Sequence, residues 1–231
     1  MSFRWFYFVI LVGLLSCNKT KNVELQYPDA QRYCPLNVGD FVVYDVIDTT
    51  YLFGNSKEGK KYQLKVKIAE KLVDKSVLAK YTIERYKRNS TTDSWTLDSL
   101  WFVSYSNQKE IIMYEANKPF VKLISPIKSS TEWNGNKYNT LNEELYAYKN
   151  IEKPYPSASY SLFDSTVTVM QNQDFDNAIG YSYKYEVYAK NIGLIYKYFN
   201  EYRYSQQDSI INKNEKVGLF RVMRYVENGN E

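Results

Sequence analysis

An all-β fold built on an antiparallel sheet is the fold class that this sequence predicts. About a dozen short runs alternate apolar and polar residues with a period of two, as strands with one buried face do. No stretch keeps the longer period that an amphipathic helix requires. The 24 Tyr, 11 Phe and 4 Trp residues agree, because aromatic side chains suit a pleated, half-buried surface. We therefore expect either a curved half-barrel or barrel, or a sandwich.

The first segment of the chain has the pattern of an export signal. Arg4 lies near the amino terminus, and residues 5–15 form an uninterrupted apolar run, WFYFVILVGLL. A helix needs about 20 apolar residues to span a bilayer, whereas a run of about 7–15 behind a positive start is typical of a signal peptide. A buried first strand is the alternative, but Arg4 and the polar residues from Asn18 onward favour export.

Cys17 ends this apolar run and is the residue on which we expect lipid attachment. The sequence Leu14-Leu15-Ser16-Cys17 resembles a bacterial lipobox. The resemblance implies cleavage before Cys17 and diacylation of its sulfur, and two or more acyl chains hold a protein stably on a membrane. We therefore divide the chain into a signal peptide (1–16), a lipidated amino terminus and tether (17–32) and a single β-rich domain (33–231).

The expected elements follow in order along the mature chain. A polar tether includes one helical turn near residues 28–32. In residues 39–51 Val42, Tyr44 and Val46 share one face. In residues 61–70 the apolar side chains face one way and lysines the other, and Asn134-Gly135 predicts a tight turn. The further expected strands are residues 77–87, 94–105, 110–114, 120–124, 145–149, 161–171, 181–190, 194–204 and 217–226.

Two of these strands, residues 181–190 and 194–204, are predicted to form a tyrosine-rich hairpin around Gly193. Tyr183 and Tyr185 share a face of the first strand, and Tyr196 and Tyr198 share a face of the second. Charged residues occupy both opposite faces. We expect the tyrosines to turn inward and the charges to meet water. An exposed tyrosine face that binds a glycan or another chain is the alternative.

The composition excludes several classes of site. The chain has no His, which excludes Ser-His-Asp and Cys-His catalysis and His-ligated metals. The formal net charge is +4, without a focused basic stripe, so we expect no nucleic-acid partner. With Cys17 lipidated, Cys34 has no intramolecular partner, and we interpret it as a small buried hydrophobe instead of a reactive thiol. We expect no cofactor.

Carboxylates supply the remaining catalytic and metal-binding candidates. Residues 174–177, DFDN, offer a few oxygen ligands, but calcium takes about six to eight, so an Asx-rich loop is the simpler interpretation and we predict no metal site. Glu84, Glu143 and Glu144 could cleave glycosides only if the fold brought two carboxyl groups to about 5–9 Å.

Two serines are candidate modification sites. Asp98-Ser99-Leu100 and Asp208-Ser209-Ile210 resemble the O-glycosylation acceptor of Bacteroidota. This resemblance implies glycosylation of Ser99 and Ser209. Turn formation also enriches Asp-Ser pairs, so this second interpretation stays open.

Several longer segments resemble an uncharacterised group of Bacteroidota lipoproteins. They are YCPLNVGDFVVYDV, EANKPFVKLISPI, TEWNGNKYN and YAKNIGLIYKYFNEY. The resemblance implies a lipid-anchored envelope protein of β-rich architecture and brings no known activity. Residues 18–21 lack the acidic residues associated with surface export in that phylum, so we expect an outer-membrane anchor that faces the periplasm.

Two functions of different classes are compatible with these observations. The first is a non-catalytic envelope lipoprotein, with the membrane as one partner through Cys17 and a protein, glycan or lipid as another, or with a structural role. The alternative is a carboxylate-based hydrolase such as a glycosidase. A concave apolar sheet would favour lipid or lipoprotein carriage, and two buried carboxylates across a cleft would favour hydrolysis.

Overall fold

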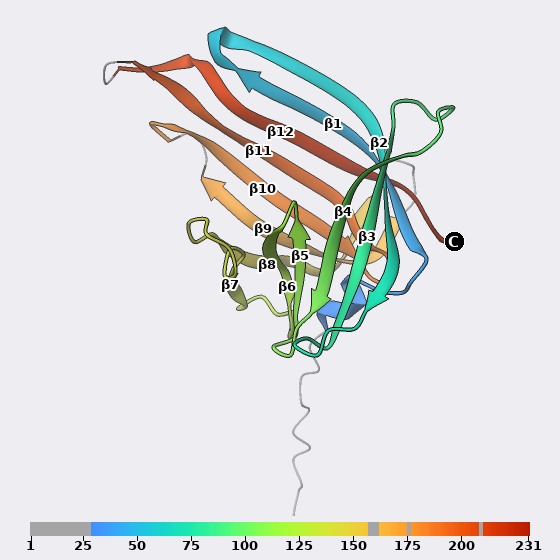
Figure 1. Ribbon diagram of the computed structural model, residues 1–231. Helices are drawn as coiled ribbons and strands as arrows, with labels where there is room; N and C mark the ends of the chain where they lie inside the picture. The colour runs from blue at the N-terminus through green and yellow to red at the C-terminus, as the bar shows by residue number, and fades with distance from the viewer. Residues whose placement is uncertain (1–28, 157–161, 175–176, 208–209) are drawn as a thin grey trace, which may run out of the picture.

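The structure is a computed structural model that describes residues 29–156, 162–174, 177–207 and 210–231. The predicted signal peptide, Cys17, Asp176 and Ser209 lie outside these residues. Within them the chain forms one antiparallel sheet of twelve strands and two short 3-10 turns, which confirms the all-β prediction (Figure 1). The elements are η1 (Ala30–Tyr33), β1 (Asp40–Leu52), η2 (Phe53–Asn55), β2 (Ser56–Leu72), β3 (Ala79–Arg88), β4 (Thr96–Tyr105), β5 (Glu110–Glu115), β6 (Lys118–Ile124), β7 (Glu132–Asn134), β8 (Leu145–Pro156), β9 (Leu162–Asp174), β10 (Gly180–Ala189), β11 (Gly193–Gln207) and β12 (Ile210–Asn230).

The sheet consists of two consecutive meanders that join through the first and last strands. Its order is β6-β5-β4-β3-β2-β1-β12-β11-β10-β9-β8-β7. In the centre β1 pairs with β12, so that Asp48 lies opposite Arg221. Because all twelve strands belong to one continuous sheet, the sandwich alternative is wrong and the barrel-like alternative holds. The sequence prediction missed β7, whose three residues are too few to show a period of two.

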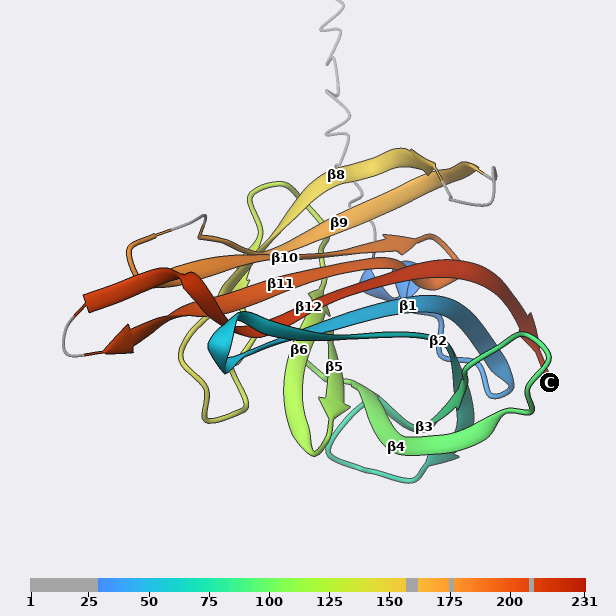
Figure 2. The ribbon, with the colours of Figure 1, turned by 90° about the horizontal axis from the view of Figure 1, so that it is seen from above.

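The sheet curls until its two outer parts meet. Figure 2 shows β3 to β6 turning back beneath the long central strands. The amide of Val121 on β6 donates a hydrogen bond of 2.9 Å to the carbonyl of Gly135, which follows β7. The Trp133 indole donates to the Val121 carbonyl at 2.9 Å, and the Tyr148 hydroxyl bonds both backbone groups of Ile124 at 2.7 Å. These contacts close one end of the barrel.

The main apolar core fills this closed end. It lies among β3 to β6, β8 and β9, and includes the fully buried side chains of Val103, Ile111 and Leu123. The turn η1 inserts Ala30 and Tyr33 into the same core. A hydrogen bond between the hydroxyl groups of Tyr33 and Ser165 ties η1 to β9 at 3.1 Å. The segment that enters the sheet therefore also plugs the end of the barrel.

The register of the tyrosine hairpin agrees with the sequence, but its orientation does not. β10 and β11 pair antiparallel, with Tyr185 opposite Tyr198, and Gly193 takes a positive φ of 104° at the turn. However, Glu186 is only 1% exposed and Lys184 only 7%, because both side chains point into the barrel. The tyrosine face, which comprises Tyr183, Tyr185, Tyr196 and Tyr198, is half-buried on the outside. The expected inward tyrosines and outward charges are thus wrong.

Candidate ligand cavity

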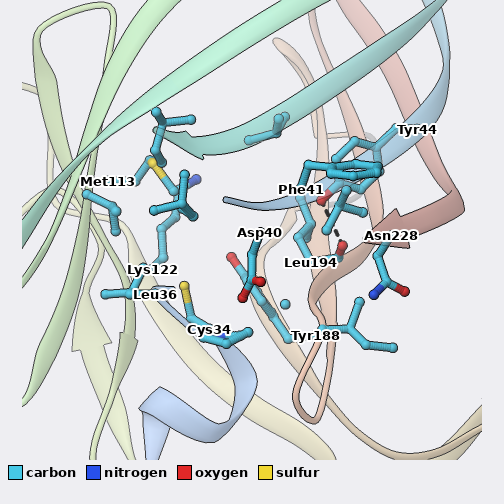
Figure 3. A pocket seen from close by; sticks show the side chains of 18 of the residues that line it. Cys34, Leu36, Asp40, Phe41, Tyr44, Met113, Lys122, Tyr188, Leu194 and Asn228 are labelled. Carbon is cyan, nitrogen blue, oxygen red and sulfur yellow. Dashed lines mark hydrogen bonds between the residues drawn. The ribbon is translucent and has the colours of Figure 1, made fainter. Parts of the chain in front are cut away.

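A cavity of about 440 Å³ lies inside the curled sheet, next to the closed end. The apolar faces that the sequence predicted for β1 and β2 form part of its wall, through Val42, Tyr44, Leu64, Val66 and Ile68. Figure 3 shows Cys34 and Leu36, from the segment after η1, on the side of the cavity opposite Tyr44. Further apolar lining comes from Ile83, Trp101, Val103, Ile111, Met113, Leu194 and Met223.

A buried ion network crosses the interior and joins the two meanders. The Lys122 ammonium on β6 lies 2.7 Å from the Glu115 carboxylate on β5 and 3.2 Å from the Glu186 carboxylate on β10. The Lys197 ammonium on β11 lies 2.9 Å from Glu186, and the Tyr188 hydroxyl donates to Glu186 at 2.6 Å. We call these five residues the ion network. Its strands are two neighbouring pairs, β5 with β6 and β10 with β11, which lie far apart in the sheet order, so the network requires the curled shape.

The ion network keeps its carboxylates charged. Burial alone would raise the pKa of Glu186, but Lys122 and Lys197 outweigh it and hold that pKa far below its usual range. Burial also acts to raise the pKa of Glu115, but the charges of Lys122 and Lys197 outweigh burial and lower that pKa. Burial would lower the pKa of Lys122, yet Glu115 and Glu186 raise it above its usual value. The interior therefore holds compensated charges, not protonated acids.

A second polar group lies on the wall formed by β1, β2, β3 and β12. Arg221 donates two hydrogen bonds to the Asp48 carboxylate, at 2.7 and 2.8 Å, and the Tyr62 hydroxyl donates to Asp48 at 3.1 Å. Burial acts to raise the pKa of Asp48, but Arg221 and Tyr62 outweigh burial and lower that pKa. On β3 the guanidinium of Arg85 stacks on the Trp101 ring, 3.7 Å from its centre.

Cys34 lines the cavity as a packing residue. It is half-buried, contacts the main core and has no disulfide partner among the described residues. Burial raises the pKa of its thiol to about 12. Because the thiolate is the reactive species, this environment makes the thiol unreactive near neutral pH. The position agrees with the sequence interpretation of Cys34 as a small hydrophobe.

The other carboxylates and the serine singled out in the sequence do not line the cavity. Glu84 accepts a hydrogen bond of 2.6 Å from Tyr86 on its own strand, while Glu144 contacts Lys184 on β10. Glu143 is exposed, and none of these three glutamates lines the cavity. The Ser99 hydroxyl donates to Asp98 at 2.9 Å and accepts from Arg85 at 3.2 Å. The fold does not assemble Glu84, Glu143 and Glu144 into a site.

The tyrosine face forms a continuous aromatic layer on the outside of β10 and β11. The rings of Tyr185 and Tyr198 stack with centres 5.5 Å apart, and those of Tyr183 and Tyr198 lie 5.6 Å apart. Next to it, Val187, Ala189 and Ile195 form a small core that Tyr155 and Phe163 help to cover. The layer therefore shields its own apolar surface, and its role as a binding face stays a prediction.

The sequence analysis missed the residues that give the cavity its chemistry. Glu186 and Lys197 occupy alternating charged positions that look like a solvated face, and no local signal places them, or Glu115 and Lys122, in the interior. Within the described ranges no cluster of His, Cys, Asp or Glu is arranged to hold a metal ion. Among the same residues, no helix is long and apolar enough to cross a membrane.

Comparisons with known proteins give distant structural similarities. No family model and no curated protein matches the sequence. One solved structure is described as a "putative exported protein with YmcC-like fold" from Bacteroides fragilis; it is 12% identical, with a TM-score of 0.42 over 87% of this chain and 98% of that chain. Another is a "putative lipoprotein" from Parabacteroides distasonis, 14% identical, with a TM-score of 0.40 over 84% of this chain and 97% of that chain.

Proposed function

We propose that this protein is a non-catalytic envelope lipoprotein, anchored to the membrane through Cys17, that holds a lipid-like ligand in the barrel interior. The observation that carries the binding role is the cavity of about 440 Å³ with a largely apolar wall. Its volume lies within the range of about 300–1,000 Å³ that is typical of ligand pockets, which are mostly apolar with a few placed polar groups.

The physical basis of binding is the apolar wall supplied by β1 to β5. Val66, Ile68 and Met113 are half-buried and line the cavity, so part of their surface remains free inside the barrel. An apolar chain placed there would be removed from water, and such burial contributes about 25 cal/mol per Å² of apolar surface. The curled sheet and the ion network hold the wall open without a ligand, because they fix the two meanders relative to each other.

The alternative function, carboxylate-based hydrolysis, has one observation in its favour. Glu115 and Glu186 both line the cavity and both contact Lys122. A glycosidase needs one carboxyl group that stays protonated near neutral pH to act as the general acid. The lysines of the ion network lower the pKa of both glutamates and so remove that acid. The electrostatics therefore favours ligand binding over hydrolysis.

Photolabelling tests the binding role. Full-length protein in liposomes is exposed to an acyl probe that carries a diazirine, and the labelled peptides are identified by mass spectrometry. We expect saturable labelling on β2, β5 and β11. Val66→Trp, which fills the cavity, should reduce this labelling severalfold, whereas Leu78→Trp, at a position 57% exposed, should not. If folded Val66→Trp protein is labelled as strongly as the wild type, the proposal is contradicted.

The anchor has its own test. Metabolic labelling with an alkyne-bearing fatty acid should mark the wild-type protein and leave Cys17→Ser unlabelled, because the sulfur of Cys17 is the expected acceptor. Fractionation of the same cells should find the wild type in the outer-membrane fraction. Equal labelling of both proteins would refute lipidation at Cys17 without affecting the cavity proposal.

A further inference from the structure

Arg85 is a buried cation in the cavity wall whose charge is incompletely compensated. Its side chain is 12% exposed and stacks on Trp101. Its Nε atom is buried and has no hydrogen-bond partner among the described residues. Its Nη1 atom donates to the hydroxyl of Ser99 at 3.2 Å, which supplies no negative charge. A buried polar donor without an acceptor costs free energy, which an added acceptor would recover.

The other cations of the cavity each have a carboxylate at hydrogen-bond distance. Arg221 has Asp48 at 2.7 Å, and Lys122 and Lys197 have the glutamates of the ion network. For Arg85, the Asp98 carboxylate lies 3.9 Å away, and this carboxylate lies 2.6 Å from the ammonium of Lys87. Among the described residues, Arg85 is therefore the cavity cation that has no carboxylate at hydrogen-bond distance.

The surroundings of Arg85 favour an added negative charge. Burial lowers the pKa of Arg85, and the like charge of Arg221 lowers it further, while Asp98 and Glu115 only partly oppose these effects. Arg85 and Arg221 both line the same cavity. An anion there would meet the Arg85 guanidinium, whereas Arg221 is already paired with Asp48. A guanidinium is planar and presents paired donors that match a carboxylate or a phosphate.

We propose that the cavity binds an anionic amphiphile, whose carboxylate or phosphate headgroup meets Arg85 and whose apolar chain lies along the wall formed by Val66, Ile83 and Leu194. The inference rests on the proposed function, because it names the class of ligand that the same cavity takes. Trp101 stacks on the guanidinium and Ser99 accepts a hydrogen bond from one of its nitrogens. The ligand would therefore meet a guanidinium that is already held in place and that loses little conformational entropy on binding.

Competition experiments test the headgroup. Full-length protein in liposomes is photolabelled with the acyl probe in the presence of unlabelled dodecanoate, dodecyl phosphate or dodecanol, which share one chain length and differ in the head. We expect either or both anions to compete at concentrations about tenfold or more below that of the neutral alcohol, since a hydrogen bond to a charged group is stronger than one between neutral groups. The ranking of the two anions distinguishes a carboxylate ligand from a phosphate ligand.

Two arginines of β3 provide a matched pair of variants. Arg88 stacks on Trp95 at 4.2 Å, as Arg85 stacks on Trp101, but it does not line the cavity. Arg85→Met should abolish the preference for anions and leave competition by dodecanol unchanged, which also shows that the cavity is intact. Arg88→Met should keep the preference. Arg85→Lys should retain part of it, because a charge remains without the planar donors.

The outcomes separate this inference from the proposed function. Competition by all three amphiphiles at the same concentration in the wild type would overturn the anionic headgroup and leave the cavity function standing. A preference for anions that survives in Arg85→Met would likewise overturn the assignment to Arg85. The absence of saturable labelling with any probe would overturn both proposals. The wild-type comparison decides the headgroup class even if Arg85→Met does not fold.

Discussion

The two faces of the β10–β11 hairpin differ in a way that reverses the usual relation between polarity and burial. The inner face carries Lys184, Glu186 and Lys197, and Glu186 is the least exposed of the three. The outer face carries tyrosines that stay half-buried by stacking on one another. The difference teaches that charges can occupy an interior when each finds an opposite partner there, and that aromatic rings can shelter an outer surface without a second layer.

The largest effect should come from breaking the ion network on the inner face. Lys122→Met removes the cation between Glu115 and Glu186, leaving buried carboxylates with too little positive charge. Such a loss typically costs about 3–5 kcal/mol of unfolding free energy. Denaturant unfolding measures it, with Lys118→Met, an exposed lysine of the same strand, as the control. If Lys122→Met loses no more unfolding free energy than Lys118→Met, the ion network does not stabilise the fold.

Acid should destabilise the protein by protonating its buried carboxylates. The folded pKa of Glu186 is depressed, so its contribution to stability is present above the usual value of 4.5 and is lost as pH falls toward the folded value. Glu115 and Asp48, also with lowered pKa values, act in the same direction. Lys122, with its raised pKa, keeps its contribution until strongly alkaline pH. Melting temperatures between pH 7 and 3 should fall steeply in the wild type and less in Glu186→Gln.

A single lysine on the inner face of β11 sharpens the comparison. The sequence pattern placed Lys197 on a solvated face, where Lys197→Ala would hardly change stability. In the structure its ammonium contacts Glu186 inside the barrel at 2.9 Å. We now expect Lys197→Ala to lower the unfolding free energy by about 1.5–3 kcal/mol, the usual contribution of a hydrogen bond to a charged group. Lys190→Ala, at an exposed position of the same hairpin, serves as the reference.

The outer face should give a smaller effect. Tyr198 contacts Tyr183, Tyr185 and Phe220 through its ring and is half-buried. Tyr198→Ala should cost about 1–2 kcal/mol, since aromatic pairs contribute about 0.5–1.5 kcal/mol beyond the burial of their surface. Thermal unfolding monitored by circular dichroism measures this loss. Unchanged stability together with lost binding of an envelope glycan or protein would identify the tyrosine face as a binding surface.

The smallest expected change comes from Tyr198→Phe. This variant keeps the ring and removes the hydroxyl, so its unfolding free energy should stay within about 0.5 kcal/mol of the wild type. A loss comparable with that of Tyr198→Ala would mean that the hydroxyl, and not ring stacking, stabilises the outer face.

The sequence predicted strands and pairings better than it predicted which side is inside. The alternation assigned the correct face to Val42, Tyr44, Leu64 and Val66. These side chains are apolar, so the sheet buries them to remove them from water. For β10 the same rule fails. Its charges are neutralised by Lys122 and other residues distant in sequence, and their approach depends on the curl of the sheet. The cavity shares that dependence, so period-two patterns alone could not locate it.

The pairing of β1 with β12 has a consequence for the order in which the protein can assemble. Asp48 and Arg221, which face each other across the sheet centre, are 173 residues apart in the chain. Each meander can form from neighbouring strands, but β1 keeps an unpaired edge until β12 has been synthesised and, if the chain is exported, has crossed the membrane. Such long-range closure slows folding, and exposed strand edges favour aggregation in the meantime. The protein is therefore expected to need protection by a chaperone for as long as its last strand is missing.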